Sequence, residues 1–397
     1  MLVRTSLRLS YLPMAAKTIE TVKATAPVVA PLASKITEDF YPRLLSKNPA
    51  AWAFFNKTNQ KKGMQQQALA DAVVAYASNI ENLAPLLPAV AKISNRHCAL
   101  GVTPDLYQMV HDTLMASIGE VLGDAVTPEI GEAWSNAVMA LAEICINEEE
   151  KLYKAAEERK GGWRGYKDFE LVKKEKVGED TVAFNFAACD SPGTGIDFTH
   201  GQYLSIRVNE EKSGVISPRH YTVTSNPGDA FLQCTTRHVK GAQGGAPDGA
   251  VSTYMHTKME VGDTVRLAPP FGVFTPDLVL GEDKNVAFVT AGIGITLAKA
   301  MSSAPSVNTI GTMHVDRSED HTGCMADQLP GKVKARSYGQ SHAAVKEQIA
   351  KFAVDVGRSS QYVLCGPIPF MKDAREALQD AGCSNIHFEL FGTGSMK

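Results

Sequence analysis

His97 is the residue in the first half of the chain whose type and position best suit chemistry. It shares a helical stripe with Val90 and Ile93, and Gly101 then ends the predicted helix. An imidazole placed there can project into a flat pocket between helices. A lone histidine on an apolar face is more often a hydrogen-bonded core residue than a ligand. The only other histidine before residue 160, His111, has no spacing that suits zinc or non-haem iron, so a single-histidine site would suit haem better.

A second group of candidate residues lies on the segment RHYTVTS. Arg219, Tyr221 and Thr222 could provide a cation for a diphosphate, an aromatic ring face and a hydroxyl for a ring nitrogen, which together would suit a flavin. Because the side chains of a strand alternate, these three do not all share one face. An ordinary barrel strand is the alternative interpretation. Further on, GAVSTYMH places small residues, Ser252 among them, at a predicted helix start where backbone N–H groups could bind a phosphate.

A third group lies where predicted buried strands end in glycine. NVAFVTAGIGIT predicts a strand that runs directly into Gly292-x-Gly294 and then a helix. Leu297 stands where a dinucleotide-binding fingerprint has its third glycine, so the motif alone is weak. QYVLCGP ends another strand at Cys365, Gly366 and Pro367. Strands that alternate with helices predict a parallel sheet whose ligand lies at the carboxyl ends of the strands.

Two kinds of sequence position these candidates, and they meet near Gly161. From 17 to 153, apolar residues recur every three or four positions, which predicts helices over 63–80, 86–99, from 104 onward and over 128–153. Thr103 and Pro104 form a predicted N-cap and N1 pair. KAAEERKGGWRG is a predicted hinge. After it, short alternating strands predict a small antiparallel barrel, in DFELVKK, TVAFNF, GQYLSIRV, RHYTVTS, FLQCTT and DTVRLAPP.

Composition argues against several classes of protein. The chain has 397 residues and a formal net charge of −3, which argues against nucleic-acid or anionic-membrane partners. No apolar run approaches the ~20 residues that span a bilayer, so an integral membrane protein is not expected. Seven cysteines without a C-x-x-C pair favour a reducing compartment and argue against a cysteine-held zinc or iron–sulfur site. We therefore expect a cytoplasmic monomer, with a mitochondrial presequence in the Arg-containing first residues as the alternative.

The helical half resembles the globin domain of the flavohaemoglobins over nearly its whole length. The matching segments are FYPRLL, NPAAWAFFN, NQKKGMQQQALADAVVAYASNIENL, HCALGVTPDLYQMV and INEEEKLY. The resemblance implies that His97 is the proximal ligand of haem b and that Tyr107 and Glu149 form a network behind it. Such a carboxylate raises the basicity of the imidazole. Periodicity alone does not select Glu149 from its acidic neighbours Glu148 and Glu150.

The same resemblance assigns the distal side of the haem. It implies that Tyr41 donates its hydroxyl to bound oxygen, that Gln65 and Leu69 line the distal face, and that Phe55 wedges the haem. Pro42 departs from the pattern, because it removes a helical hydrogen bond and restricts the residue before it. It predicts a kink in the distal helix beside Tyr41.

The second half, from about residue 162 to 391, resembles the ferredoxin-reductase-like flavoprotein module of the same family. The resemblance implies that FAD is bound by Tyr203, Arg219, His220, Tyr221 and Thr222, with the segment FELFGTG reaching the flavin through Leu390, Phe391 and Gly392. It implies that NAD(P)H is bound by Gly292, Ile293, Gly294, Ile295, Thr296 and Leu297, with Cys365, Gly366 and Pro367 near the nicotinamide. Ile295 and Leu297 replace the polar residue and the proline usual in the family, which places cofactor affinity in question.

These expectations describe a multidomain protein. It would have an N-terminal extension over 1–15, an all-α globin domain over 16–158, an antiparallel β-barrel FAD domain over 159–276 and an α/β parallel-sheet NAD(P)-binding domain over 277–397. The implied function is oxidation of nitric oxide to nitrate with O2, with electrons passing from NAD(P)H through FAD to haem. The alternatives are a general NAD(P)H-dependent reductase, a haem-based gas sensor, and a flavoreductase with a haem-free helical module. NADH and NADPH stay open, because HVDRSED offers both Asp316 and Arg317 after the second strand.

Overall fold

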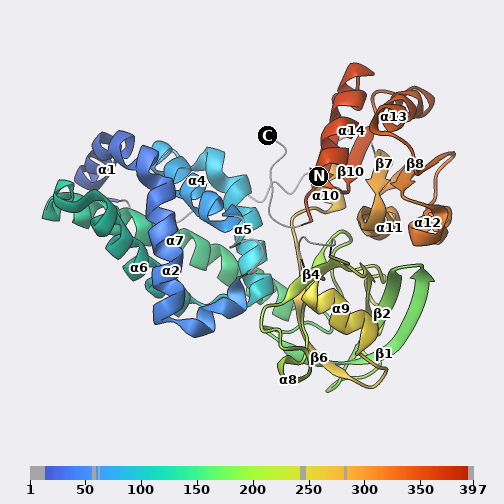
Figure 1. Cartoon of the computed structure of the whole chain (residues 1–397), viewed down its shortest axis with the longest axis horizontal. Helices are drawn as coiled ribbons and strands as arrows, with labels where there is room; N and C mark the ends of the chain where they lie inside the picture. Colours follow the sequence, from blue (N-terminus) through green and yellow to red (C-terminus); the bar gives the residue numbers. More distant parts are fainter. Residues whose placement is uncertain (1–13, 56–59, 61–62, 242–246, 281–283, 392–397) are drawn as a thin grey trace. The chain divides into compact units, whose positions relative to one another are not determined.

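A computed structural model describes residues 14–55, 60, 63–241, 247–280 and 284–391 of the chain. The chain divides into two compact units, Met1–Lys154 and Ala155–Lys397. The first is helical, and the second contains two β-sheets with their helices (Figure 1).

The helical unit is built from amphipathic helices joined by short 3₁₀ turns. Its helices are α1 (Ala16–Val29), α2 (Ala33–Lys47), α4 (Met64–Ser78), α5 (Leu87–Leu100), α6 (Pro104–Leu122) and α7 (Pro128–Glu157), and its 3₁₀ turns are η1 (Ala30–Leu32), η2 (Pro49–Phe54), η3 (Ala84–Leu86) and η4 (Gly123–Ala125). The α2 stripe of Ile36, Phe40 and Leu44 is buried in the core. The helices predicted over 63–80, 86–99 and 128–153 are confirmed within a few residues.

Pro42 and Thr103 are the two places in the helical unit where the local structure adds detail to the sequence predictions. Helix α2 continues through Pro42 without a break, and the kink expected beside Tyr41 stays a prediction. The helix carries Tyr41 into the core despite the backbone hydrogen bond that proline removes. Thr103 precedes α6 as expected, but its hydroxyl does not cap the helix and donates instead to Asp105 Oδ1 at 2.5 Å. Gly101 ends α5 as predicted, in the left-handed conformation with φ +79°.

The first sheet of the second unit is the predicted antiparallel barrel. Its strands are β1 (Lys167–Gly178), β2 (Thr181–Ala188), β3 (Tyr203–Arg207), β4 (Arg219–Thr222), β5 (Leu232–Arg237) and β6 (Thr264–Phe271), in the order β4-β3-β6-β1-β2-β5. A bridge between Val223 and Cys234 joins the β4 and β5 edges. Helix α9 (Ala250–Thr257) packs Val251, Tyr254 and Met255 against the barrel core, and a short helix α8 spans Glu210–Ser213.

The second sheet is parallel, with the order β11-β10-β7-β8-β9. Its strands are β7 (Asn285–Ala291), β8 (Asn308–Asp316), β9 (Val333–Tyr338), β10 (Gln361–Cys365) and β11 (Ile386–Glu389). Its helices are α10 (Pro276–Val279), α11 (Ile295–Ser302), α12 (Glu319–Gln328), α13 (His342–Val356) and α14 (Ile368–Asp380), with η5 (Gly292–Gly294) after β7. Val286 and Phe288 pack with α11 and α12, whereas Ala287 and Val289 pack with α13 and α14. Alternating strand residues thus bury both faces, which explains the near-continuous apolar run of β7.

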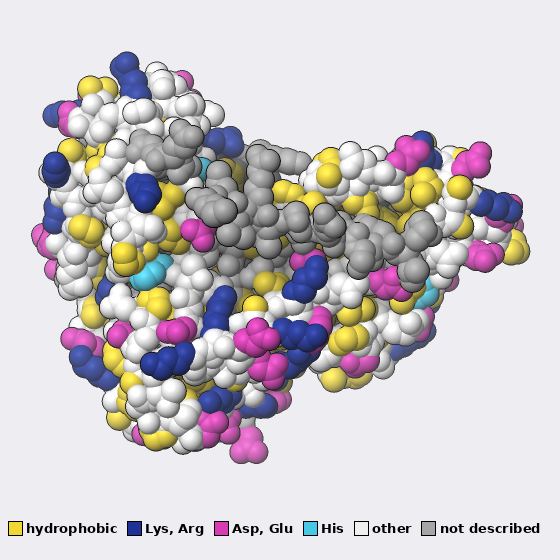
Figure 2. All heavy atoms as spheres, turned by 180° about the vertical axis from the view of Figure 1, so that it is seen from behind, with side chains coloured by type: hydrophobic (Ala, Val, Ile, Leu, Met, Phe, Trp, Pro, Cys, Tyr) yellow, Lys and Arg dark blue, Asp and Glu magenta, His cyan; other side chains and the backbone are white. Residues whose placement is uncertain are grey.

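The surface carries both signs of charge. On the face shown in Figure 2, Lys and Arg side chains are interspersed with Asp and Glu and do not gather into one basic patch. Among the described residues, no helix is long and apolar enough to cross a bilayer.

Candidate functional site

His97 belongs to a hydrogen-bonded triad whose three residues come from three helices. The imidazole Nδ1 lies 2.8 Å from the Tyr107 hydroxyl of α6 and 2.8 Å from Glu149 Oε1 of α7. Tyr107 also donates to Glu149. Glu149 is buried, whereas Glu148 and Glu150 pair with exposed lysines. The structure therefore selects Glu149 from three consecutive glutamates.

The triad fixes which ring nitrogen of His97 is available. An ionised carboxylate only accepts hydrogen bonds, so Nδ1 carries the proton that it donates to Glu149. In the neutral imidazole this places the lone pair on Nε2, with which no described residue forms a hydrogen bond. The His97 side chain is 33% exposed. A neutral imidazole oriented by a carboxylate behind it is typical of metal-ligating histidines, so these residues fit haem iron at Nε2.

Cys145 is a neighbour of this triad that the sequence did not reveal. It lies one helical turn before Glu149 on α7, in a small core that Tyr107 packs against. Burial and the nearby Glu149 carboxylate raise the pKa of the Cys145 thiol to about 12, which keeps it uncharged. Burial, together with Cys145 and Glu149, also raises the pKa of Tyr107. The four-residue spacing from Glu149 was the available signal, but spacing cannot separate a core thiol from a site neighbour.

A second cluster contains the residues expected on the distal side. Tyr41 of α2 donates its hydroxyl to the backbone oxygen of Gln65 in α4 at 3.2 Å. Its ring meets that of Phe55 edge-on, with centroids 5.4 Å apart, and Phe55 and Leu69 pack against the same core. Burial raises the pKa of Tyr41, so the phenol remains a donor at neutral pH. The side-chain oxygen of Gln65 is buried with no hydrogen-bond partner among the described residues, which leaves a polar atom for a ligand.

Arg219 is held in the barrel without a carboxylate. Its Nη1 donates to the backbone oxygens of Ser217 and Pro218 and to the Ser217 hydroxyl, at distances of 2.8–3.2 Å. Burial lowers the pKa of Arg219, and no described Asp or Glu forms an ion pair with it. A half-buried guanidinium with only neutral acceptors favours an anionic ligand such as a diphosphate. The residue therefore fits the flavin role that the sequence assigned to it.

The neighbours of Arg219 on β4 lie on two faces, as strand alternation predicts. Tyr203 of β3 pairs with Thr222, and its ring lies 5.0 Å from that of His220. Thr222 is buried, and Tyr221 is half-buried against the barrel core. Arg219 and Tyr221 therefore face one way, and His220 and Thr222 face the other.

Ser252 uses its hydroxyl within the protein. It donates to the Gly249 carbonyl at 2.9 Å and accepts from the Val239 N–H at 3.2 Å. The side chain is already satisfied and buried, so a phosphate could reach only the backbone N–H. The phosphate site predicted at the start of α9 therefore depends on the first-turn N–H groups.

The predicted dinucleotide loop lies at the point where the strand order reverses. Strands β7 and β10 are adjacent, and the helices that follow them, α11 and α14, pack on opposite faces of the sheet. Gly292 has φ +52°, and a β-carbon added to Gly294 would clash with the Cys365 carbonyl oxygen. A β-carbon on Gly366 would lie 2.9 Å from that of Ala291. Open α/β sheets bind ligands in the crevice at this position.

Most side chains of this loop face the core. Ile295 and Leu297 are buried in the cluster between the sheet and α11, and Thr296 donates to the Ile293 carbonyl at 2.9 Å. Ile295 and Leu297 can therefore offer a nucleotide only their backbone. Packing explains the two apolar replacements that the sequence had placed in question.

The remaining predicted residues lie at two strand ends. Cys365 is fully buried at the end of β10, where burial raises the pKa of its thiol, and Pro367 precedes α14. Leu390 is half-buried and Phe391 is 49% exposed, just after β11. Gly392 lies outside the described residues.

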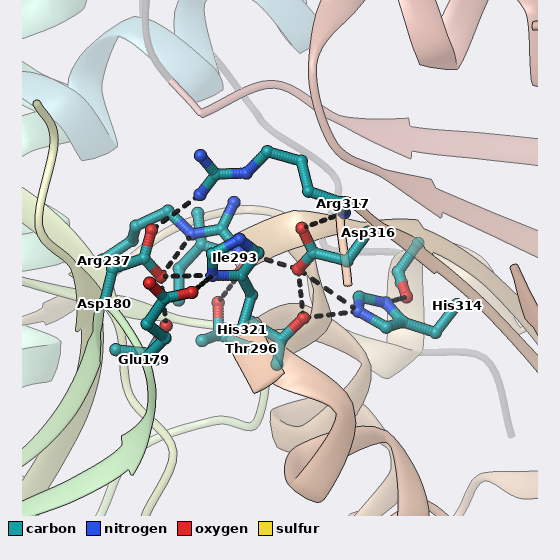
Figure 3. A network of polar contacts seen from close by, with 12 residues as sticks. Glu179, Asp180, Arg237, Ile293, Thr296, His314, Asp316, Arg317 and His321 are labelled. Atoms are coloured by element: carbon teal, nitrogen blue, oxygen red, sulfur yellow. Dashed lines mark hydrogen bonds and ion pairs between the residues drawn. The ribbon is translucent and has the colours of Figure 1, made fainter. Parts of the chain in front are cut away.

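Asp316 and Arg317, the alternatives for recognising the nucleotide ribose, lie in different environments (Figure 3). Asp316 accepts from Arg237 Nη2 at 2.7 Å, from the Thr322 hydroxyl, and from the Arg317 N–H at 2.8 Å. The Arg317 guanidinium is exposed and donates to Asp180 at 2.7 Å. Asp316 is therefore committed to protein contacts and is not free for a ribose hydroxyl.

Sequence reasoning missed the partners in this network. Asp180 lies in the β1–β2 turn, Arg237 ends β5, and His321 of α12 lies 3.5 Å from Asp180. The same turn contacts α12 through its backbone, because Glu179 N–H donates to the Asp320 carbonyl at 2.6 Å. Charges at strand ends were the only signal, and their pairing depends on how the barrel meets the parallel sheet.

Comparisons with known proteins identify the family. A globin family model matches residues 38–145, and a model of the oxidoreductase FAD-binding domain matches residues 168–275. Flavohemoproteins of Bordetella parapertussis and Bacillus subtilis are 35% and 31% identical to the chain, over 94% and 95% of it and 98% and 97% of their own lengths. The chain belongs to the flavohaemoprotein family. The family combines a globin domain with a ferredoxin-reductase-like module, and the predicted fold class is confirmed.

A solved flavohaemoprotein structure agrees with this assignment. The flavohaemoglobin from Malassezia yamatoensis, determined with bound FAD and haem, is 26% identical to the chain and has a TM-score of 0.77. The match covers 95% of this chain and 99% of that protein, so it extends over both units.

Proposed function

We propose that this flavohaemoprotein is a nitric oxide dioxygenase, which oxidises nitric oxide to nitrate with O2 and takes its electrons from NAD(P)H. The His97 triad carries the proposal, because it places an oriented iron ligand in the same chain as a flavin barrel and a dinucleotide loop. The Malassezia yamatoensis protein holds FAD and haem, and we assign both cofactors to this chain. When bound, haem supplies the iron at which O2 and nitric oxide react, and FAD links a two-electron donor to one-electron chemistry.

The proximal residues tune His97 as a ligand. His97 would hold the iron through Nε2 while Glu149 accepts the Nδ1 proton. This hydrogen bond makes the imidazole more basic and more strongly donating. Tyr107 donates to the same carboxylate and fixes its position. A strongly donating proximal ligand favours oxygen activation over reversible oxygen carriage.

The distal residues would orient a ligand and exclude water. Tyr41 can donate to a ligand if its hydroxyl leaves the Gln65 carbonyl, and that bond of 3.2 Å is long for an O–H donor. Gln65 also offers its side-chain oxygen, which is buried and has no hydrogen-bond partner among the described residues. Phe55 and Leu69 provide the apolar wall around this phenol.

In the second unit, we assign side chains to the flavin and mainly backbone to the dinucleotide. Arg219 would bind the FAD diphosphate, with Tyr203, His220, Tyr221 and Thr222 around the flavin ring system. The N–H groups of residues 292–297 would surround the NAD(P)H phosphates. Gly294 packs against the backbone of Cys365 and Gly366 with no space for a side chain, and we assign the nicotinamide to the strand end beside Cys365 and Pro367. We keep the domain limits 16–158, 159–276 and 277–397 as proposals.

A gas sensor and a general reductase are the competing functions. A sensor does not need a carboxylate behind its histidine, so the Tyr107–Glu149 pair favours catalysis. A general reductase is compatible with the second unit, whose candidate residues all lie within Ala155–Lys397.

Stopped-flow measurement of nitric oxide consumption tests the proposal. We expect consumption to require both O2 and a reduced nicotinamide, and to yield nitrate in equal amount. Running NADH and NADPH separately shows which donor is preferred. An absorption spectrum without a Soret band would eliminate the haem assignment. Reduction of ferricyanide at full rate with no nitric oxide consumption would favour the general reductase.

We also propose that the protein acts as a cytoplasmic monomer on small-molecule substrates and does not bind nucleic acid. The formal net charge of −3 and the mixed charges in Figure 2 support the last point. Cell fractionation and light scattering test the location and the oligomeric state.

A further inference from the structure

Arg237 lies where the barrel meets the turn Gly292–Gly294 of the predicted dinucleotide loop, the nucleotide turn. It is the last residue of β5, and Gly292 is the first residue after β7. A β-carbon added to Gly292 would lie 2.8 Å from Nη1 of Arg237, so the guanidinium lies directly against the turn. Gly292 also has a positive φ of +52°, which side chains rarely adopt. An arginine is therefore held at the carboxyl edge of the sheet, where ligands of such folds bind.

This guanidinium has partners but is not saturated (Figure 3). Its Nη2 donates to Asp316 at 2.7 Å, whereas Nε lies 3.3 Å from Asp180 without forming a hydrogen bond. No described residue accepts a hydrogen bond from Nη1, the nitrogen that faces Gly292. The side chain is 19% exposed, so solvent screens it only partly. The N–H groups of Nη1 that face the nucleotide turn therefore have no acceptor among the described residues.

The carboxylate of Asp316 is the anion that pairs with this guanidinium. It is the last residue of β8, the strand beside β7. Burial would raise the pKa of Asp316, but His314, Thr322 and Arg237 hold it well below its usual value, so the carboxylate is charged. Carboxylate and phosphate oxygens fit a guanidinium in the same way. A phosphate at the turn would therefore compete with Asp316 for one cation.

We propose that Arg237 binds the diphosphate of NAD(P)H and that Asp316 is its partner when no nucleotide is present. The inference rests on the proposed dinucleotide-dependent function. Asp180 would keep the guanidinium near the turn during the exchange. Asp316 would not be left unpaired, because Thr322 and the Arg317 N–H still donate to it. The exchange therefore avoids the large penalty of leaving a buried charge alone.

The proposal predicts opposite effects for the two partners. Arg237→Gln removes the phosphate ligand and should weaken ADP binding about 10-fold or more, because hydrogen bonds between charged groups are the strong ones. Asp316→Asn keeps the shape of the side chain and removes the competing charge. It should tighten ADP binding a few-fold, because a larger fraction of the protein then has Arg237 free to bind phosphate. Arg237→Lys keeps the charge without the planar fork and should lie between Arg237→Gln and the wild type.

Calorimetric titration of FAD- and haem-loaded protein with ADP tests these effects. Arg266→Gln is the matched control, because it removes an exposed arginine of the same barrel that pairs with Asp168 and should leave ADP affinity within about twofold. The KM for NADH in flavin reduction should follow the ADP dissociation constant while kcat changes less. Thermal unfolding confirms that each variant is folded.

Three results would overturn the proposal. One is unchanged ADP affinity in Arg237→Gln. A second is weakened binding in Asp316→Asn comparable to that in Arg237→Gln, which would make the pair a structural contact between barrel and sheet. The third is loss of FAD from Arg237→Gln with unchanged ADP affinity, which would assign the guanidinium to the flavin diphosphate. ADP binding needs no turnover, so absent nitric oxide consumption would count against the proposed function and not against this inference.

Discussion

The His97 triad and the Gly292 turn build their sites from different parts of the chain. His97, Tyr107 and Glu149 come from three helices, and their side chains make the chemistry. At the turn, the side chains of Ile295 and Leu297 are buried in the core, and Gly292 and Gly294 allow the backbone to pack closely against Arg237 and Cys365. The iron of haem is held by an electron-pair donor on a side chain, whereas a diphosphate can be held by backbone N–H groups. The two sites should therefore fail in different ways when mutated.

The sharpest test of this contrast is His97→Ala, for which we expect the largest effect. Removing the only proposed protein ligand of the iron should abolish the Soret band and nitric oxide consumption. NADH-dependent ferricyanide reduction should stay within about twofold, because the reductase residues lie in the other unit. His111→Ala, which removes a histidine bonded to Ser135 on the same unit, should keep the Soret band. Full nitric oxide consumption in His97→Ala would contradict the assignment of the iron ligand.

The second test asks whether Glu149 acts through His97. Glu149→Gln removes the charge behind the imidazole and should lower nitric oxide consumption about 10-fold to 100-fold, as loss of such partners does at other metal sites. The iron–histidine stretching frequency in resonance Raman spectra should fall, a change that a purely structural role would not produce. Glu148→Gln is the control, since Glu148 pairs with Lys151 instead. Equal effects from both variants would argue against the triad.

The third test addresses the backbone site. In Gly294→Ala the new β-carbon would meet the Cys365 carbonyl, so the turn must shift. We expect a KM for NADH at least about 10-fold higher and a free energy of unfolding lower by about 2 kcal/mol, with an unchanged haem spectrum. Gly119→Ala in α6 has open space around its β-carbon and should be neutral or slightly stabilising in denaturant unfolding. A normal KM in Gly294→Ala would show that the turn is not a nucleotide site.

The smallest expected effects compare one helix start in each unit. Ser341 accepts from the Ala344 N–H at 3.3 Å, so Ser341→Ala should lower the free energy of unfolding by about 1 kcal/mol. Thr103 makes no such bond, and Thr103→Ala should cost no more than about 0.5 kcal/mol. Urea unfolding of the two variants measures the difference. A larger loss for Thr103→Ala would show that the hydroxyl caps α6 in solution.

Local patterns predicted most of the fold because they depend on residues near one another in the chain. The strands from DFELVKK to DTVRLAPP, and the run into Gly292, form where expected. Thr103 and Pro104 stand at the predicted N-cap and N1 positions, but the Thr103 hydroxyl bonds the charged Asp105 instead of a backbone N–H. Helix α2 runs through Pro42 without a break, because it is anchored in the core on both sides of that residue. At Pro42 tertiary packing thus outweighed local preference, whereas at Thr103 a second local contact replaced the cap.

The sequence by itself determined the fold class, the two kinds of cofactor module and the residue types at their centres. Periodicity and motifs carry that information because hydrophobic burial and strand pairing follow local patterns. The family resemblance named Glu149, but only the tertiary structure shows that it, and not its neighbours, faces His97, and that Asp316 is paired with Arg237. Both contacts join residues more than fifty positions apart, and a hydrogen bond between them depends on how whole elements pack. No local pattern contains that information.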